Sequence, residues 1–134
     1  MTCFEWPVRV YYEDTDSGGV VYHANYLKCM ERARTEWLRH LGFEQDQLRQ
    51  EYHCLFAVHS MQITFRQPAR FNDQLQVRSR LNKVAGASLV FEQKIFRNDE
   101  LLCSAMVKVA CLEAHQFRPM AIPSLILMEI RSEC

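Results

Sequence analysis

Apolar and polar residues alternate at the start of the chain. The positions that repeat with a period of two are Trp6, Val8, Val10 and Tyr12. This period places the four side chains on one face of an extended strand. Pro7 cannot donate a backbone hydrogen bond, which favours an edge or a bulge at this point of a sheet. We therefore predict a strand over residues 4–12 that begins at an edge or bulge.

A helical period follows over residues 25–41. The residues that share one broad apolar face at about 100° per residue are Tyr26, Leu27, Met30, Ala33, Trp37, Leu38 and Leu41. Gly42 supplies the C-terminal stop. Arg34 falls on the apolar face, and we expect its aliphatic stem to pack while its charge reaches solvent, rather than a buried pairing with Glu13 or Asp14.

Four further strand-like runs occupy the second half of the chain. They cover residues 55–66, 74–84, 88–97 and 101–112, and turn residues separate them. Short connections between successive runs favour antiparallel pairing. Residues 44–54 predict a short helical turn and a loop, and residues 125–130 predict a short helix packed on the body. The whole pattern predicts an α+β fold in which an antiparallel sheet of about five strands wraps around one long central helix.

The composition narrows the possible classes of protein. The 134 residues are enough for a single domain, and 16 basic side chains balance 16 acidic ones. This balance argues against a nucleic-acid partner, and no stretch approaches the ~20 apolar residues that would insert in a membrane. The six cysteines show no metal-ligand spacing, and the start of the sequence shows no leader pattern. We expect a reduced, cytoplasmic chain without a bound metal.

The connection between the first strand and the long helix carries the densest chemistry. Residues 11–26 read YYEDTDSGGVVYHANY, with three acids, two adjacent glycines and one histidine. A simple strand-to-helix connection does not need so many polar groups. We therefore predict that this loop is the active site.

Three other interpretations of the loop compete with this one, and the first two each lack a feature that their class of protein requires. Asp14, Asp16 and Gly19 match the first, third and sixth positions of a calcium-binding EF-hand loop, but Asn25 stands where a bidentate Glu is needed. The Asp-x-Asp pattern also occurs in aspartate-based phosphatases, which need a doubly wound parallel sheet. The plainest alternative is that the acids, Glu13 included, solvate a turn and favour the positive end of the following helix.

The complete motif Tyr-x-Asp-x-Asp-x-Gly-Gly-Val-Val-Tyr-His-x-Asn-Tyr resembles the signature of hot-dog-fold acyl-CoA thioesterases of the 4-hydroxybenzoyl-CoA thioesterase family. The likeness extends to Glu-Arg-Ala-Arg-Thr-Glu at 31–36, Pro-Ala-Arg-Phe-Asn-Asp at 68–73 and Ser-Leu-Val-Phe at 88–91. It is strongest to the bacterial branch associated with the Tol-Pal cell-envelope system, often called YbgC. The resemblance implies a single hot-dog domain over residues 1–134.

The resemblance also implies a set of catalytic groups. Asp16 would be the catalytic carboxylate, either attacking the thioester carbonyl or acting as a general base on water. The backbone N–H of His23 would hold the carbonyl oxygen at the start of the helix, where negative charge is favoured. The His23 side chain could orient water, protonate the leaving thiolate or simply cap the helix. Gly18 and Gly19 would allow a positive φ or a close approach of substrate to the backbone.

Further candidates for substrate binding are Tyr12, Tyr22, Asn25, His59, Lys83 and Ser88. His59 lies on a strand that lines the acyl site in relatives, and Lys83 and Ser88 bound a turn where relatives often carry basic residues for the phosphates of coenzyme A. Arg66 and Arg70 are weaker candidates for the same phosphates. Because this turn holds one lysine only, acyl carrier protein is an alternative carrier. Coenzyme A is part of the substrate, so no separate cofactor is expected.

Three functions are consistent with these features. The first is hydrolysis of a small or medium acyl-CoA by a homodimer or homotetramer with sites at subunit interfaces. The second is a hot-dog hydratase, but that class resembles Asp-x-x-x-x-His, whereas Asp16 and His23 are seven positions apart. The third is a non-catalytic acyl-binding or scaffolding subunit of envelope or lipid-synthesis machinery.

Overall fold

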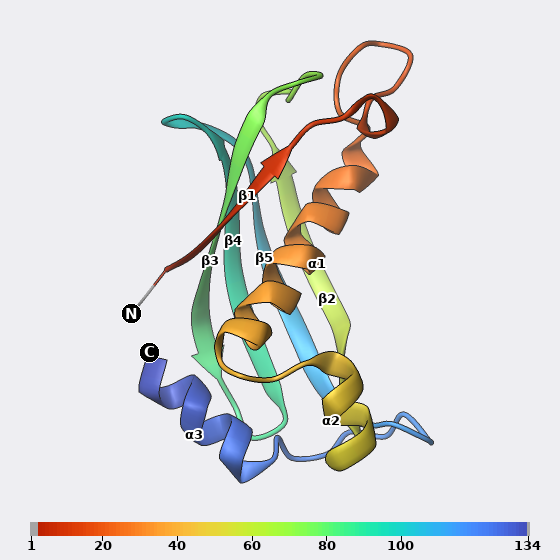
Figure 1. Ribbon diagram of the computed structural model, residues 1–134, viewed down its shortest axis with the longest axis vertical. Helices are drawn as coiled ribbons and strands as arrows, with labels where there is room; N and C mark the ends of the chain where they lie inside the picture. The colour runs from red at the N-terminus through yellow and green to blue at the C-terminus, as the bar shows by residue number, and fades with distance from the viewer. Residues whose placement is uncertain (1–2, 134) are drawn as a thin grey trace.

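The computed structural model describes residues 3–133 and contains one antiparallel sheet. The strands are β1 (Phe4–Arg9), β2 (Cys54–Phe65), β3 (Gln74–Val84), β4 (Ser88–Arg97) and β5 (Glu100–Glu113), and the helices are α1 (His23–His40), α2 (Gln45–Glu51) and α3 (Ser124–Glu133). The strand order is β1-β3-β4-β5-β2. The sheet curves around α1, and α2 and α3 lie at the end of the sheet opposite the loop that precedes α1 (Figure 1). This arrangement confirms the predicted α+β hot-dog fold.

The core lies between α1 and the face of the sheet that it covers. Residues of α1 that are buried there include Tyr26, Met30, Ala33, Trp37 and Leu38, as the helical period predicted. On the sheet, buried residues of β3 and β4 alternate with more exposed ones along each strand. Each fully buried large aliphatic side chain contributes about 1.5–3 kcal/mol through removal of apolar surface from water. The period of the sequence therefore fixes which face of each element points inward.

Two boundaries differ from the prediction. The first strand ends at Arg9, which pairs with Gln74 at the start of β3, so the ladder has no partner beyond it. The chain then closes a 3-10 turn, η1 (Tyr12–Asp14), because the Tyr11 amide donates to Oδ2 of Asp14 at 2.8 Å. Helix α1 begins two residues earlier than predicted. The four later strands agree with their predicted bounds to within one residue at each end.

The expectation for Arg34 is wrong. Its guanidinium does not extend into bulk solvent but donates from Nη1 to Oε1 of Gln93 on β4 at 2.8 Å. Gln93 is fully buried, and its side-chain amide donates to the Met30 carbonyl at 3.0 Å and to Oγ of Ser79 at 2.9 Å. Burial lowers the pKa of Arg34. A polar tie thus joins the middle of α1 to β3 and β4 through the core.

The two edge strands differ in length and regularity. β1 is six residues long and carries Pro7, which confirms the predicted edge position. β2 is twelve residues long and contains a bulge between Val58 and Ser60. Val58 and Phe65 on β2 are each about half exposed, at 49% and 46%. β2 is therefore the long edge with apolar side chains at its surface.

Four cysteines lie in the core without disulfide bonds: Cys29, Cys54, Cys103 and Cys111. Burial raises the pKa of Cys103 and of Cys111 to about 12. These side chains are therefore neutral thiols at physiological pH. Within residues 3–133, no helix has both the length and the apolar character needed to cross a bilayer.

Candidate functional site

The loop before α1 is held in place by backbone hydrogen bonds. Thr15 and Val21 form an antiparallel bridge, and the Asp16 amide donates to the Val20 carbonyl at 2.9 Å. The segment 66–73 supports this hairpin from outside, because the Val21 amide donates to the Ala69 carbonyl at 2.8 Å. Two sequence motifs that lie about fifty residues apart are thus neighbours at one end of the sheet. These hydrogen bonds give the loop a defined conformation.

The three acids of the loop have different environments. Asp14 is a structural residue, because its Oδ2 accepts from the Tyr11 amide and its carbonyl accepts from the Tyr22 amide at 2.9 Å. Glu13 is exposed and makes no hydrogen bond or ion pair within residues 3–133. Asp16 is also exposed, and its Oδ1 accepts from the Gly18 amide at 2.8 Å. Asp16 is therefore oriented through one carboxylate oxygen, while Oδ2 has no partner in the described part of the chain.

Glycine is favoured at positions 18 and 19 for two different structural reasons. Gly19 has a φ of +80°, a conformation that side chains with a Cβ rarely adopt. A Cβ at Gly18 would lie 3.2 Å from Oδ1 of Asp16, so any larger residue would crowd the carboxylate. The predicted positive φ is thus confirmed at Gly19, whereas Gly18 has none, and a close approach of substrate to either glycine stays a prediction. The close neighbour at Gly18 is the Asp16 side chain.

The start of α1 leaves backbone donors open. Tyr22 is the N-cap residue and makes no side-chain capping bond, and the amides of His23 and Ala24 donate to no acceptor within residues 3–133. The Asn25 amide is satisfied by the Tyr22 carbonyl at 2.8 Å. The buried Asn25 side chain donates from Nδ2 to the Asp14 carbonyl at 2.8 Å, which ties the helix start to the loop. Open amides at a helix start favour a ligand oxygen with negative charge.

Aromatic side chains surround the helix start. The His23 ring lies 4.6 Å from the Tyr22 ring and 6.1 Å from the Phe65 ring at the end of β2. Tyr26 is buried beside Phe65, and its hydroxyl accepts from the Ala69 amide at 3.0 Å. Tyr12 is 77% exposed and stacks on the Phe71 ring at 4.1 Å, on the supporting segment. His23 and Tyr22 are thus placed at one apolar wall, whereas Tyr12 belongs to a separate stack.

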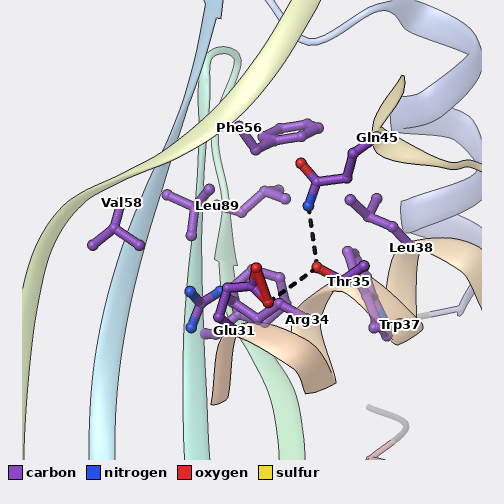
Figure 2. A pocket seen from close by; sticks show the side chains of 11 residues that line it. Glu31, Arg34, Thr35, Trp37, Leu38, Gln45, Phe56, Val58 and Leu89 are labelled. Carbon is purple, nitrogen blue, oxygen red and sulfur yellow. Dashed lines mark hydrogen bonds between the residues drawn. The ribbon is translucent and has the colours of Figure 1, made fainter. Parts of the chain in front are cut away.

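An apolar groove begins one helical turn after His23. It has a volume of about 550 Å³ and runs between α1 and β2, with the lining residues Leu27, Lys28, Glu31, Arg32, Arg34, Val58 and Met61. A cavity of about 250 Å³ continues from it toward Trp37, Phe56, Leu89 and Phe91, and Figure 2 shows this inner part. Apolar walls with a few polar groups are typical of small-molecule sites. Asp16 and His23 line neither volume, and Leu27 is the groove residue nearest to them in sequence.

The remaining predicted residues are dispersed. His59 is exposed and is the extra residue of the β2 bulge. Lys83 and Ser88 lie at the far end of β3 and β4, roughly 30 Å from the loop at ~3.3 Å per strand residue. Arg70 forms an isolated bridge with Val20, so this weaker candidate lies beside the loop instead. A single chain therefore does not bring Lys83 and Ser88 to Asp16.

Comparison with known proteins gives the family. The family model described as the thioesterase-like superfamily matches residues 10–130. The chain belongs to the thioesterase-like superfamily. The acyl-CoA thioesterase YbgC of Haemophilus influenzae is 48% identical to this thioesterase-like chain over 120 residues, which cover 90% of the chain and 88% of the relative. The acyl-CoA thioester hydrolase YbgC of Escherichia coli is 46% identical over 131 residues, 97% of each protein.

Solved structures support the same family. The crystal structure of a probable thioesterase from Bartonella henselae superposes with a TM-score of 0.88 at 34% identity, and covers 91% of this chain and 100% of that one. The resemblance inferred from the loop motif is thus confirmed. Within residues 3–133, no group of three His, Cys, Asp or Glu side chains could hold a metal ion.

The sequence interpretation missed the polar residues of the core. Gln93 lies in the same phase of β4 as Leu89, Phe91 and Ile95, all of them buried. A polar residue in the apolar phase of a strand, together with Arg34 in the apolar phase of the helix, was the available signal. Neither pattern alone shows that the two side chains meet.

Proposed function

We propose that the chain is an acyl-CoA thioesterase that hydrolyses the thioester of a small or medium acyl-CoA or of an acyl carrier protein adduct. Relatives at 46–48% identity over nearly the whole chain carry the name of this activity. The observation that carries the proposal is the pairing of an oriented, exposed Asp16 carboxylate with open amides at the start of α1. Both belong to one segment, residues 16–24, which the Asn25 side chain ties together through the Asp14 carbonyl.

The proposed chemistry follows from these two groups. A thioester carbonyl needs a nucleophile at carbon and donors at oxygen. Asp16 supplies the first, by direct attack or by removing a proton from water, and the His23 amide supplies the second. The Ala24 amide is available as an additional donor. Water then provides the oxygen of the product carboxylate, and the thiolate of the carrier leaves and takes up a proton.

The acyl group has a natural place in the groove between α1 and β2. Its walls begin at Leu27, one helical turn or ~5.4 Å beyond the proposed donor at His23. Met61 and Val58 continue the apolar surface toward the inner cavity. Chain-length preference would then depend on how far this cavity extends in the assembled protein.

We further propose that the active form is a homodimer, or a homotetramer built from dimers, paired through the β2 edge. β2 is an edge strand with unpaired backbone N–H and C=O groups, and its Val58 and Phe65 side chains are half exposed. A long edge with apolar side chains can pair with the same edge of a second chain. Antiparallel pairing of two β2 strands would bring the far end of one subunit toward the loop of the other. In such a dimer, Lys83 and Ser88 of one subunit could contribute to the site formed by the Asp16 loop of the other. The free buried cysteines favour a reducing compartment, and we place the protein in the cytoplasm.

The decisive experiment compares Asp16→Asn with Glu13→Gln. Thiol release is measured on acyl-CoAs of graded length and on acyl carrier protein adducts. Asp16→Asn removes the nucleophile or base, and we expect turnover to fall at least ~100-fold, the usual contribution of such a group. Glu13→Gln changes an exposed acid three positions away and is expected to leave turnover within about twofold.

Both variants must keep the circular dichroism spectrum and sedimentation behaviour of the wild type. Unchanged turnover in Asp16→Asn would reject the catalytic assignment. Absence of cleavage of every thioester by the wild type would leave the non-catalytic acyl-binding or scaffolding subunit as the better explanation.

A further inference from the structure

Arg34 occupies the junction of the groove and the inner cavity. It lines both volumes, as do Glu31 and Val58, and Figure 2 shows it beside the apolar side chains of the inner part. The only hydrogen bond of its side chain within residues 3–133 is the one from Nη1 to Oε1 of Gln93. No carboxylate of the described residues lies within 4.0 Å of its guanidinium. A cation thus stands in an apolar cleft without an ion-pair partner.

The position of this guanidinium is fixed by the core. Gln93 has no exposed surface and is itself held by the Met30 carbonyl and by Ser79. An arginine keeps its charge when partly buried and offers five N–H donors in one plane. Since one donor is used by Gln93, others remain for the cleft. No nitrogen of Arg34 is both buried and unpartnered, so these donors are accessible from the cleft, and a ligand oxygen placed there can accept a charge-assisted hydrogen bond.

Neighbouring groups select the kind of oxygen. Glu31 lines the same cleft, and its Oε2 accepts from Oγ1 of Thr35 at 3.4 Å, while that hydroxyl accepts from Nε2 of Gln45 at 3.2 Å. The cations Lys28 and Arg32 line the outer groove but not the inner cavity, so Glu31 and Arg34 are the charged side chains that line both. A ligand carboxylate that reaches the inner cavity would meet the negative charge of Glu31. A hydroxyl group can accept from Arg34 and donate to Glu31, so it satisfies both. The chemistry of the cleft therefore fits an alcohol better than an acid.

The distance along α1 sets the length of the ligand. Arg34 follows His23 by eleven residues, or ~16 Å at ~1.5 Å per residue. Helical side chains tilt back toward the N-terminus, which shortens the distance that the ligand must span. An extended chain advances ~1.2 Å per bond, by analogy with the extended backbone. The full ~16 Å corresponds to ~13 bonds, and a side chain that reaches back by ~4 Å leaves ~12 Å, or roughly ten carbons, between the proposed carbonyl site and Arg34.

We propose that Arg34 is a specificity-determining residue, and that the enzyme prefers acyl-CoAs of about ten carbons with a hydroxyl at the far end of the chain over the plain alkyl chains. This inference rests on the proposed thioesterase function. It adds a recognition site for the acyl terminus, separate from Asp16 and the start of α1. The groove carries the methylene chain, and the Arg34–Glu31 pair of groups receives the hydroxyl.

The test compares matched substrates. The ratio of kcat/KM for ω-hydroxydecanoyl-CoA to that for decanoyl-CoA is expected to be about tenfold in the wild type, the gain of a hydrogen bond to a charged group. The corresponding ratio for ω-hydroxybutanoyl-CoA and butanoyl-CoA is expected to be near one, because the short chain does not reach Arg34. Equal kcat/KM values for the two decanoyl substrates would overturn the inference.

Variants assign the preference to the side chain. Arg34→Met is expected to abolish the tenfold ratio while decanoyl-CoA is still cleaved, and Arg49→Met, on the exposed surface of α2, is expected to keep it. A ratio that survives in Arg34→Met would also overturn the inference. If Arg34→Met does not fold, Glu31→Gln must lower the ratio in its place, and an unchanged ratio there counts against the proposal. Loss of all cleavage in the wild type would instead refute the thioesterase function, so the two failures are distinguishable.

Discussion

The two ends of the sheet differ in how completely they are packed. At the loop end, formed by residues 10–26 and 66–73, aromatic rings are exposed and the first amides of α1 are open. At the turn end, formed by residues 83–88, α2 and α3, Ile126 and Ile130 are fully buried and the Ile122 amide donates to the Gly86 carbonyl at 2.8 Å, although Leu125 and Met128 on the outer face of α3 are exposed. The proposed catalytic groups thus lie at the end where the start of α1 is left open.

The same contrast is visible within α1. At its C-terminal end, Gly42 has a φ of +97° and the Phe43 amide donates to the Leu38 carbonyl at 3.0 Å, which caps the helix. At its N-terminal end, Tyr22 provides no side-chain cap. A Ser, Thr, Asp or Asn cap would typically add about 1 kcal/mol. The helix start thus lacks this stabilisation, and its first amides stay open within the described residues.

The largest expected effect is at the turn end. Ile126→Ala leaves a cavity beneath α3 and is expected to lower the free energy of unfolding by about 2–5 kcal/mol. Urea denaturation measures this loss. Because α3 is far from the loop (Figure 1), kcat of the folded enzyme is expected to stay within about twofold of the wild type. A large fall in kcat without unfolding would contradict the separation of the two ends.

Asn25→Ala tests the loop end. The change removes the bond to the Asp14 carbonyl and leaves that part-buried carbonyl with the Tyr22 amide as its remaining partner among the described residues, at a cost of about 1 kcal/mol. In contrast to Ile126→Ala, we expect turnover to fall more steeply than stability, because the helix start and the Asp16 loop lose their tie. Both kcat and the urea midpoint of unfolding should be measured for this variant. A fall in kcat no larger than the loss of stability accounts for would show that Asn25 acts on stability alone.

Gly19→Ala and Gly42→Ala form a matched pair across the two ends. Both glycines have a positive φ and open space where a Cβ would stand, so each substitution is expected to cost about 1–2 kcal/mol of backbone strain. Thermal denaturation measures both. Only Gly19→Ala is expected to slow thioester cleavage, since it shifts the hairpin that presents Asp16. Equal effects on cleavage would remove the distinction.

The smallest expected effect concerns acid pH. Burial opposes ionisation of Asp73, but hydrogen bonds from the Arg70 amide and from Arg97 together hold its pKa below the ordinary value of 3.8. Its contribution to stability is therefore complete above that value and is lost as pH falls through the lower pKa of the folded state. The stability difference between wild type and Asp73→Asn should shrink below about pH 4.

Glu113 provides the control for Asp73 at the turn end. The Gln116 and His115 amides hold its pKa below the ordinary value of 4.5, so the acid dependence has the same sign. Glu113→Gln should also reduce the acid sensitivity of unfolding. Only Asp73→Asn is expected to alter turnover, because Asp73 anchors the segment beside the loop through the Arg70 amide. Identical turnover profiles for the two variants would contradict this assignment.

Much of the fold was predictable because its elements are strongly periodic. The bounds of β3 and β4 and the apolar face of α1 follow from alternation and helical spacing. The end of β1 was not predictable. The strand ends at Arg9 because its partner there, Gln74, is the first residue of β3, and the alternation within β1 does not report where β3 begins. Periodicity reports which way a side chain faces, but not what it meets.

The candidate site shows the same limit. The Asp16 loop was evident from its density of polar groups, and the positive φ of Gly19 followed from its type. The tie between Arg34 and Gln93 depends on two elements that cross in space, fifty-nine residues apart, so no local pattern contains it. The separation of Lys83 from the loop likewise follows only from the direction of β3.

The buried thiols can be used to measure how often the core opens. Alkylating reagents attack the thiolate, and with a pKa near 12 Cys103 and Cys111 present almost none of it while enclosed. Each labelling event must therefore wait for a transient opening of the strands that hold them. The alkylation rate of the native protein, followed by mass spectrometry, would therefore report how often the sheet opens away from α1, and no cysteine needs to be introduced.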